Sequence, residues 1–220
     1  MYLEKIQSPE DVKKLDVEQL KVLAGEMRQA LIQKLSVHGG HVGPNLGMVE
    51  ATIAMHYVFD SPKDKMVFDV SHQSYCHKML TGRADAFLDE AKYDDVSGYS
   101  EPSESAHDFF CIGHTSTSVS LACGLAKARD LADENYNVIA VIGDGSLSGG
   151  EALEGLDFAK ELNGNLIVVV NDNEMFIAEN HGGLYENLKL LRDTKGQAEC
   201  NIFKAMGLNY VFVEDGNDLT

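Results

Sequence analysis

Basic side chains are scarce in this sequence of 220 residues. It has 18 lysines and arginines against 35 aspartates and glutamates, which gives a formal net charge of −17. The lysines and arginines form no basic run, so we expect neither a nucleic acid nor an anionic membrane surface as a partner. No apolar stretch approaches the roughly 18 residues that a membrane-spanning helix needs. The opening MYLEKIQSPEDVKKL contains acids and no apolar segment, so we do not expect a signal peptide.

Cysteines are also few and scattered. The four cysteines form no C-x-x-C pair and no Cys/His spacing typical of a metal site. We therefore expect reduced thiols that pack in the core or on helices of a cytoplasmic protein. With 44% hydrophobic residues the chain can bury one sizeable core, and its length permits one or two domains.

Apolar residues follow a helical period in several segments. The first such segment runs from Leu20 to Leu35, with Asp16 as its N-cap and the glycines of HGGH at its end. Further helices are predicted over residues 46–59, 114–132 and 151–162.

Short apolar runs alternate with these helices. Five of them are predicted to be strands, at residues 66–70, 109–113, 137–143, 165–172 and 209–213. The third and fourth are continuous and β-branched, as in strands that are covered on both faces. Residues 84–108 are polar and read as an irregular surface excursion. The alternation predicts an α/β fold, with a mainly parallel β-sheet flanked by helices.

Polar loops follow the predicted strands. They are DVSHQ, IGHTSTS, GDGSLSGG and NDNEM, which begin at residues 69, 112, 143 and 171. In open parallel sheets, ligands bind beyond the carboxyl ends of the strands. Four polar loops at one edge therefore predict a binding site there.

The loop VIGDGSLSGG, residues 141–150, suits either a nucleotide phosphate or a metal. The dinucleotide pattern fails because Ser148 stands at its third glycine, and the Walker pattern fails because no lysine follows. Asp144 and Asn173 lie one strand-to-strand crossover apart, which places a carboxylate and an amide at one edge. Mg²⁺ takes such oxygens and completes its shell with phosphates and water. The alternative is that Asp144 is a turn residue and Asn173 caps the next segment. This alternative leaves the spacing of the two residues unexplained.

Several motifs resemble one known family. GDG followed 25 residues later by an asparagine-containing turn is similar to the thiamine-diphosphate motif. GGHVGPNLGMVEATIAMHYVF, DVSHQSYCHKMLTGR and GHTSTSVSLACGLAKA resemble the N-terminal domain of the 1-deoxy-D-xylulose-5-phosphate synthase family, in the transketolase superfamily. With GDGSLSGGEALEGL and NDNEMFIAENHGG, the resemblance covers most of residues 36–183 in unbroken order. It implies a thiamine-diphosphate-binding, transketolase-like fold.

The resemblance also implies roles for individual residues. Asp144, Asn173 and the carbonyl of Met175 would hold Mg²⁺. Cofactor contacts would come from His72, Gly113, His114, Thr115, Gly145, Ser146 and Asn173. His41 would reach toward the reacting carbon, with His72 and His114 beside the cofactor. Imidazole suits proton transfer to and from a ketol oxygen because it titrates near neutrality.

The family reaction is carried out by the cofactor. Thiamine diphosphate attacks pyruvate, CO₂ leaves, and the carbanion adds to glyceraldehyde 3-phosphate in a step that feeds isoprenoid and thiamine synthesis. The activating glutamate comes from a second domain that nothing in these residues matches. We therefore expect residues 1–220 to be the diphosphate- and Mg²⁺-binding N-terminal domain of a longer chain, inactive alone. The resemblance further implies a cytoplasmic homodimer.

Three departures from the family pattern leave the substrate open. The family loop DVGHQAYPHK appears as DVSHQSYCHK, Asn217 replaces a histidine, and residues 184–209 are much shorter than the family segment. One alternative is a transketolase-like paralogue that transfers a two-carbon ketol unit. Another is a non-catalytic cofactor-binding subunit.

Overall fold

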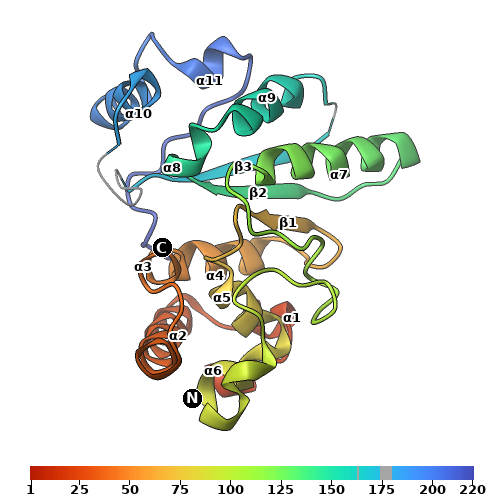
Figure 1. Cartoon of the computed structure of the whole chain (residues 1–220), viewed down its shortest axis with the longest axis vertical. Coiled ribbons are helices and arrows are strands. Elements are labelled where there is room, and N and C mark those ends of the chain that lie inside the picture. The colour runs from red at the N-terminus through yellow and green to blue at the C-terminus, as the bar shows by residue number, and fades with distance from the viewer. Residues whose placement is uncertain (163, 174–179) are drawn as a thin grey trace.

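A parallel three-stranded sheet forms the centre of the computed structural model, which describes residues 1–162, 164–173 and 180–220. The strands are β1 (Lys65–Phe68), β2 (Val138–Gly143) and β3 (Leu166–Asn171), in the order β1-β2-β3 (Figure 1). Both pairs run parallel, so the carboxyl ends of all three strands lie at one edge. The predicted α/β fold is confirmed.

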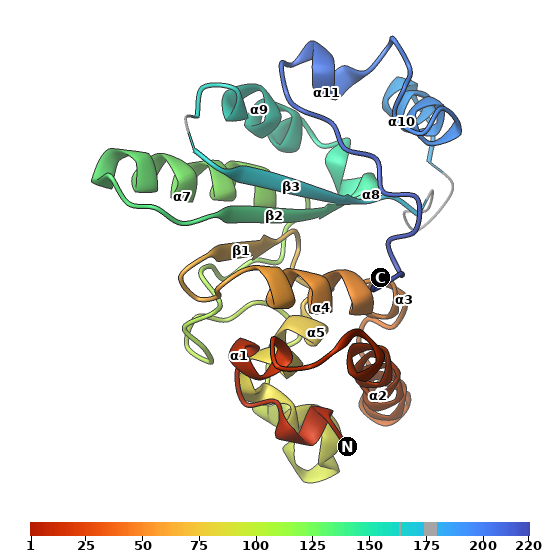
Figure 2. The ribbon, with the colours of Figure 1, turned by 180° about the vertical axis from the view of Figure 1, so that it is seen from behind.

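Helices cover both faces of this sheet (Figure 2). The α-helices are α1 (Pro9–Val12), α2 (Val17–His38), α3 (Gly43–Leu46), α4 (Val49–Val58), α5 (Tyr75–Lys78), α6 (Asp85–Leu88), α7 (Ser118–Ala132), α8 (Asp144–Leu147), α9 (Gly150–Ala159), α10 (Gly183–Asp193) and α11 (Ile202–Ala205). Three short helices of other types are η1 (Leu3–Lys5), η2 (Met79–Arg83) and η3 (Glu90–Asp95). The described helices include none long and apolar enough to cross a bilayer.

The alternation of side chains along β2 explains the two layers. Ala140 and Ile142 belong to the apolar cluster with α7 and α9, whereas Ile139 and Val141 pack in the cluster that contains Met55 of α4. These side chains are fully buried, so β2 is covered on both faces as predicted. The same prediction is wrong for β3, because this edge strand is only partly buried and Ile167 is 38% exposed.

Helix α2 forms where its apolar period predicts. Asp16 caps it by accepting from the Gln19 amide, and the Gln19 side chain accepts from the Asp16 amide in return. Leu23 and Met27 are fully buried in a second core with α4 and the short helices around Phe87. The helix ends at His38, because the next residue, Gly39, has a φ of 85°, which is not a helical value.

Two predicted strands do not form. At residues 109–113, the Ile112 carbonyl accepts from the Ser71 hydroxyl instead of from a strand amide. At residues 209–213, Tyr210 stacks on a ring of α11 and leaves Val211 80% exposed. Residues 84–108 are also more ordered than predicted, because they include α6 and η3.

A buried ion-pair network anchors the segment before residue 109. Arg83 donates to both carboxylate oxygens of Asp108 at 2.9 Å, and the Glu101 amide donates to the same side chain. His77 lies 3.2 Å from Asp108. Burial alone would raise the pKa of Asp108, but the hydrogen bonds from His77 and Arg83 outweigh it and hold that pKa well below its usual range.

Removing this buried carboxylate is expected to destabilise the protein strongly. Asp108→Ala removes the buried carboxylate that pairs with Arg83 and His77 and leaves Arg83 with Glu104 as its counter-ion. Breaking a buried pair typically costs about 3–5 kcal/mol of unfolding free energy. Asp94→Ala is the control, because Asp94 is exposed and pairs with the exposed His38 at the surface. Urea denaturation followed by circular dichroism measures both. Equal losses in the two variants would contradict a structural role for the Asp108 network.

Candidate functional site

Polar side chains directly follow all three strands. Asp69 follows β1, Asp144 follows β2, and Asp172 and Asn173 follow β3. Asp69 and Asp144 are almost fully buried, at 1% and 2% exposure. Since the strands are parallel, these groups share one edge of the sheet.

Asp69 joins the first of these loops to the start of α7. Its carboxylate oxygens accept the amides of Ser116 and Ser118, both at 2.9 Å. Ser116 adopts a φ of 73°, and its hydroxyl donates to the Ser146 carbonyl at 2.7 Å. The loops after β1, before α7 and after β2 are therefore fixed to one another. Asp69 is not among the residues predicted for the site, although an aspartate directly after a predicted strand is a usable signal.

His41 and His72 are brought together. Their ring centroids are 5.0 Å apart with an interplanar angle of 67°, and Tyr99 lies 6.0 Å from the His41 ring. Burial, followed by the neighbouring His41, lowers the pKa of His72, while Asp69 acts in the opposite direction. The shift favours the neutral form of the His72 ring, which is the form that can accept a proton.

The third predicted histidine is arranged differently. His114 is exposed, and its Nδ1 lies 2.7 Å from the Thr115 carbonyl, to which it donates. This bond leaves Nε2 as the acceptor nitrogen of the neutral ring. Gly113 beside it is exposed and Thr115 is half-buried, so the loop presents backbone and side chain to solvent. Within the described residues, the ring contacts of His41 and His72 do not extend to His114.

Asp144 lies in a negative environment. Burial and the nearby Asp172 raise its pKa to about 6. Asn180 donates to the Asp144 carboxylate at 2.8 Å, and Arg192 pairs with Asp172. A buried carboxylate at this position fits a divalent cation, because a cation would offset the cost of burying its charge.

The expected magnesium ligands are a carboxylate, an amide and a main-chain carbonyl. No group of three His, Cys, Asp or Glu side chains suited to a metal occurs in the part of the chain that the structure describes. The expected magnesium site contains only one side chain of these four types, Asp144, because its other two ligands are an amide oxygen and a main-chain carbonyl. The absence of a three-residue group therefore does not bear on this site. Met175 lies outside the described residues. Gly145 follows Asp144 directly, and its carbonyl accepts from the Tyr185 hydroxyl.

The two departures near the C-terminus have structural counterparts. Asn217 donates to Glu50 at 3.0 Å, and Glu50 also pairs with Arg28. The segment that was expected to be short forms α10 and α11, whose side chains Leu191 and Phe203 pack into the core that contains β2. Figure 1 shows the C-terminus beside α3, which follows the His41 loop.

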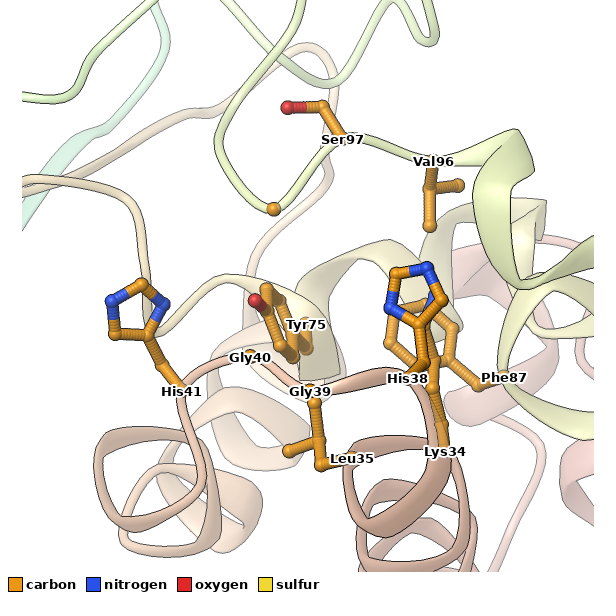
Figure 3. Close-up of a pocket in the computed structure, with 11 residues that line it drawn as sticks. Lys34, Leu35, His38, Gly39, Gly40, His41, Tyr75, Phe87, Val96 and Ser97 are labelled. Atoms are coloured by element: carbon orange, nitrogen blue, oxygen red, sulfur yellow. The ribbon is translucent and has the colours of Figure 1, made fainter.

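A cavity of about 270 Å³ adjoins His41. Figure 3 shows His41 and His38 on opposite sides of it, with Tyr75 between them. Lys34 and Ser97 contribute further polar side chains to its lining. The volume lies slightly below the range typical of pockets for drug-sized ligands, so it suits only a small molecule.

Comparison with known proteins decides the family. A model of the 1-deoxy-D-xylulose-5-phosphate synthase family matches residues 3–201. The chain belongs to this family. It is 52% identical over 192 residues to the 1-deoxy-D-xylulose-5-phosphate synthase of Dictyoglomus turgidum, which covers 87% of this chain and 31% of that protein. The match to the enzyme of the same name from Listeria monocytogenes is 45% over 221 residues, covering 98% of this chain and 36% of the relative.

The family match extends through all the loops that form the site, since the site lies within residues 41–180. The chain spans about a third of the length of the curated relatives it matches. The 1-deoxy-D-xylulose-5-phosphate synthase of Brevibacillus brevis, for example, is 53% identical over 195 residues, which are 89% of this chain and 31% of that protein.

Removing the Asp69 carboxylate is expected to release the loop before α7. Asp69→Ala leaves the Ser116 and Ser118 amides without acceptors, at about 1–3 kcal/mol for each buried group. Their hydrogen exchange should accelerate, as measured by NMR or mass spectrometry.

Asp64→Ala is the matched control at the other end of β1. Asp64 is 5% exposed and accepts from the amides of Asp60 and Asn137, far along the strand from the α7 loop. Its removal should leave exchange at Ser116 and Ser118 unchanged. Unaltered exchange in Asp69→Ala would show that Asp69 does not hold the loop.

Proposed function

We propose that the complete enzyme is a thiamine-diphosphate-dependent 1-deoxy-D-xylulose-5-phosphate synthase. It would join pyruvate and glyceraldehyde 3-phosphate with loss of CO₂. The observation that carries this proposal is the family match over residues 3–201, which includes all the loops at the carboxyl edge of the sheet. The proposal includes a homodimer in the cytoplasm, as the family resemblance implies.

Within this proposal, the edge of the sheet binds the cofactor's diphosphate through Mg²⁺. Asp144, Asn173 and the Met175 carbonyl would hold the metal. The position of Asp144 supports this assignment, because its carboxylate is buried at the end of β2, and burial followed by the nearby Asp172 raises its pKa to about 6. Contacts to the cofactor would come from Gly113, Thr115, Gly145 and Ser146. When bound, thiamine diphosphate would supply the nucleophilic carbon and the electron sink that loss of CO₂ requires.

The histidines would move protons around the reacting carbon. His41 and His72 form the pair best placed for this task, because their rings are in edge-to-face contact. The lowered pKa of His72 favours its neutral form, which can take a proton from a hydroxyl group. His114, with Nδ1 donating to a carbonyl, would present Nε2 as its acceptor.

A transketolase-like reaction is the second candidate. It is favoured by Asn217, whose amide is bonded to Glu50 where the family resemblance has a histidine. A changed acceptor site would alter which sugar phosphate is used without changing the cofactor.

Donor preference tests the proposed reaction. Full-length enzyme with thiamine diphosphate and Mg²⁺ is given either pyruvate or xylulose 5-phosphate, each with a panel of aldose phosphates. We expect CO₂ and a five-carbon ketose phosphate from pyruvate and glyceraldehyde 3-phosphate. Turnover with the ketose donor alone would replace the synthase by the transketolase-like reaction. Loss of turnover with both donors would favour a non-catalytic subunit.

The same assay tests the metal ligands through a pair of variants. Asp144→Ala should lower turnover by more than the roughly 10- to 100-fold typical of outer-shell partners of a metal. Asp157→Ala, an exposed aspartate on α9, should leave it unchanged. Equal activity of the two variants would remove Asp144 from the metal site.

A further inference from the structure

Asn45, on the short helix α3, is fully buried between two loops. Its amide nitrogen donates to the carbonyls of His41 and His72, both at 2.7 Å. Its amide oxygen accepts from the Tyr75 amide at 3.0 Å. Both side-chain N–H groups and the oxygen of Asn45 are therefore engaged.

The two loops that Asn45 joins have little regular structure of their own. His41 follows Gly39 and Gly40, which both have positive φ, so the end of α2 does not fix its position. His72 follows Val70 and Ser71, whose φ values of 56° and 70° are unusual for residues with side chains. A direct hydrogen bond to each histidine's own carbonyl is thus a strong constraint on where the two rings lie.

We propose that Asn45 is a positioning residue that sets the spacing of His41 and His72 for the reaction. The inference rests on the proposed function, since it assigns that spacing to ketol formation. It follows from the pattern of bonds, in which one buried amide reaches the backbone of His41, 4 residues before it, and that of His72, 27 residues after it. The 5.0 Å contact between the rings is the geometry that this clamp maintains.

Substitution of Asn45 is expected to reduce catalysis through misplacement of the pair. Asn45→Ala should lower kcat for pyruvate and glyceraldehyde 3-phosphate about 100-fold, since a displacement of 1 Å can cost that much. The dissociation constant of thiamine diphosphate should change much less than kcat, because His72 is the one predicted cofactor contact whose backbone Asn45 bonds. Asn45→Ser, which retains one donor, should show a smaller loss of kcat.

Asn201→Ala is the matched control for loss of a buried asparagine. Asn201 is 3% exposed and accepts from the Phe203 and Lys204 amides at the start of α11. Figure 1 shows α11 far from α3. This variant should be destabilised without a change in kcat.

A second readout reports the spacing itself. In full-length enzyme with labelled histidine, NMR titration gives the pKa of His72, which faces His41 and Asp69. Replacing His41 by Gln should raise that pKa in the otherwise unchanged enzyme and in Asn201→Ala. The rise should be much smaller when Asn45 is Ala or Ser, because the rings are then no longer held in contact.

Two results would overturn the role of Asn45. One is an equal effect of His41→Gln on the pKa of His72 with and without Asn45. The other is that Asn45→Ala abolishes the effect of His41→Gln on the pKa of His72 but leaves kcat unchanged, since the spacing of the rings would then not serve the reaction. A lack of turnover in the unsubstituted enzyme would overturn the proposed function instead. The titrations of His72 distinguish this result from failure of the Asn45 proposal, because they do not depend on turnover.

Discussion

The parallel hydrogen bonding of β2 to both β1 and β3 is the constraint on which the site depends. It brings the carboxyl ends of all three strands to one edge, although Asp69, Asp144 and Asn173 are far apart in sequence. The apolar side chains of β2 stabilise this arrangement, because α7 and α4 bury them from opposite faces. A buried, rigid strand thus supports loops that are rich in polar groups.

Those loops are held by buried side chains that bond to backbone. Asp69 accepts two amides at the start of α7, and Asn45 bonds to three backbone groups around His41 and His72. Each side chain satisfies polar groups that would otherwise be costly to bury. Irregular loops can therefore keep defined positions at the sheet edge.

Sequence patterns predicted the elements whose signals are local. The capping of α2 by Asp16 and the burial of β2 follow from residue type and period, and both are confirmed. The predicted strands at 109–113 and 209–213 are wrong, because an apolar run does not specify a partner strand. The polar loops were predicted to share an edge, but the roles of Asn45 and Asp69 depend on contacts between distant segments. Those contacts have no periodic signature in the sequence.

The central claim is that the diphosphate and its metal bind between the loops after β2 and β3. The most direct measurement is a crystal structure of the full-length enzyme with thiamine diphosphate and Mn²⁺ in place of Mg²⁺, with anomalous scattering used to locate the metal. We predict one anomalous peak coordinated by the Asp144 carboxylate and the Asn173 amide oxygen. A metal bound elsewhere, with Asp144 outside its coordination shell, would contradict this account.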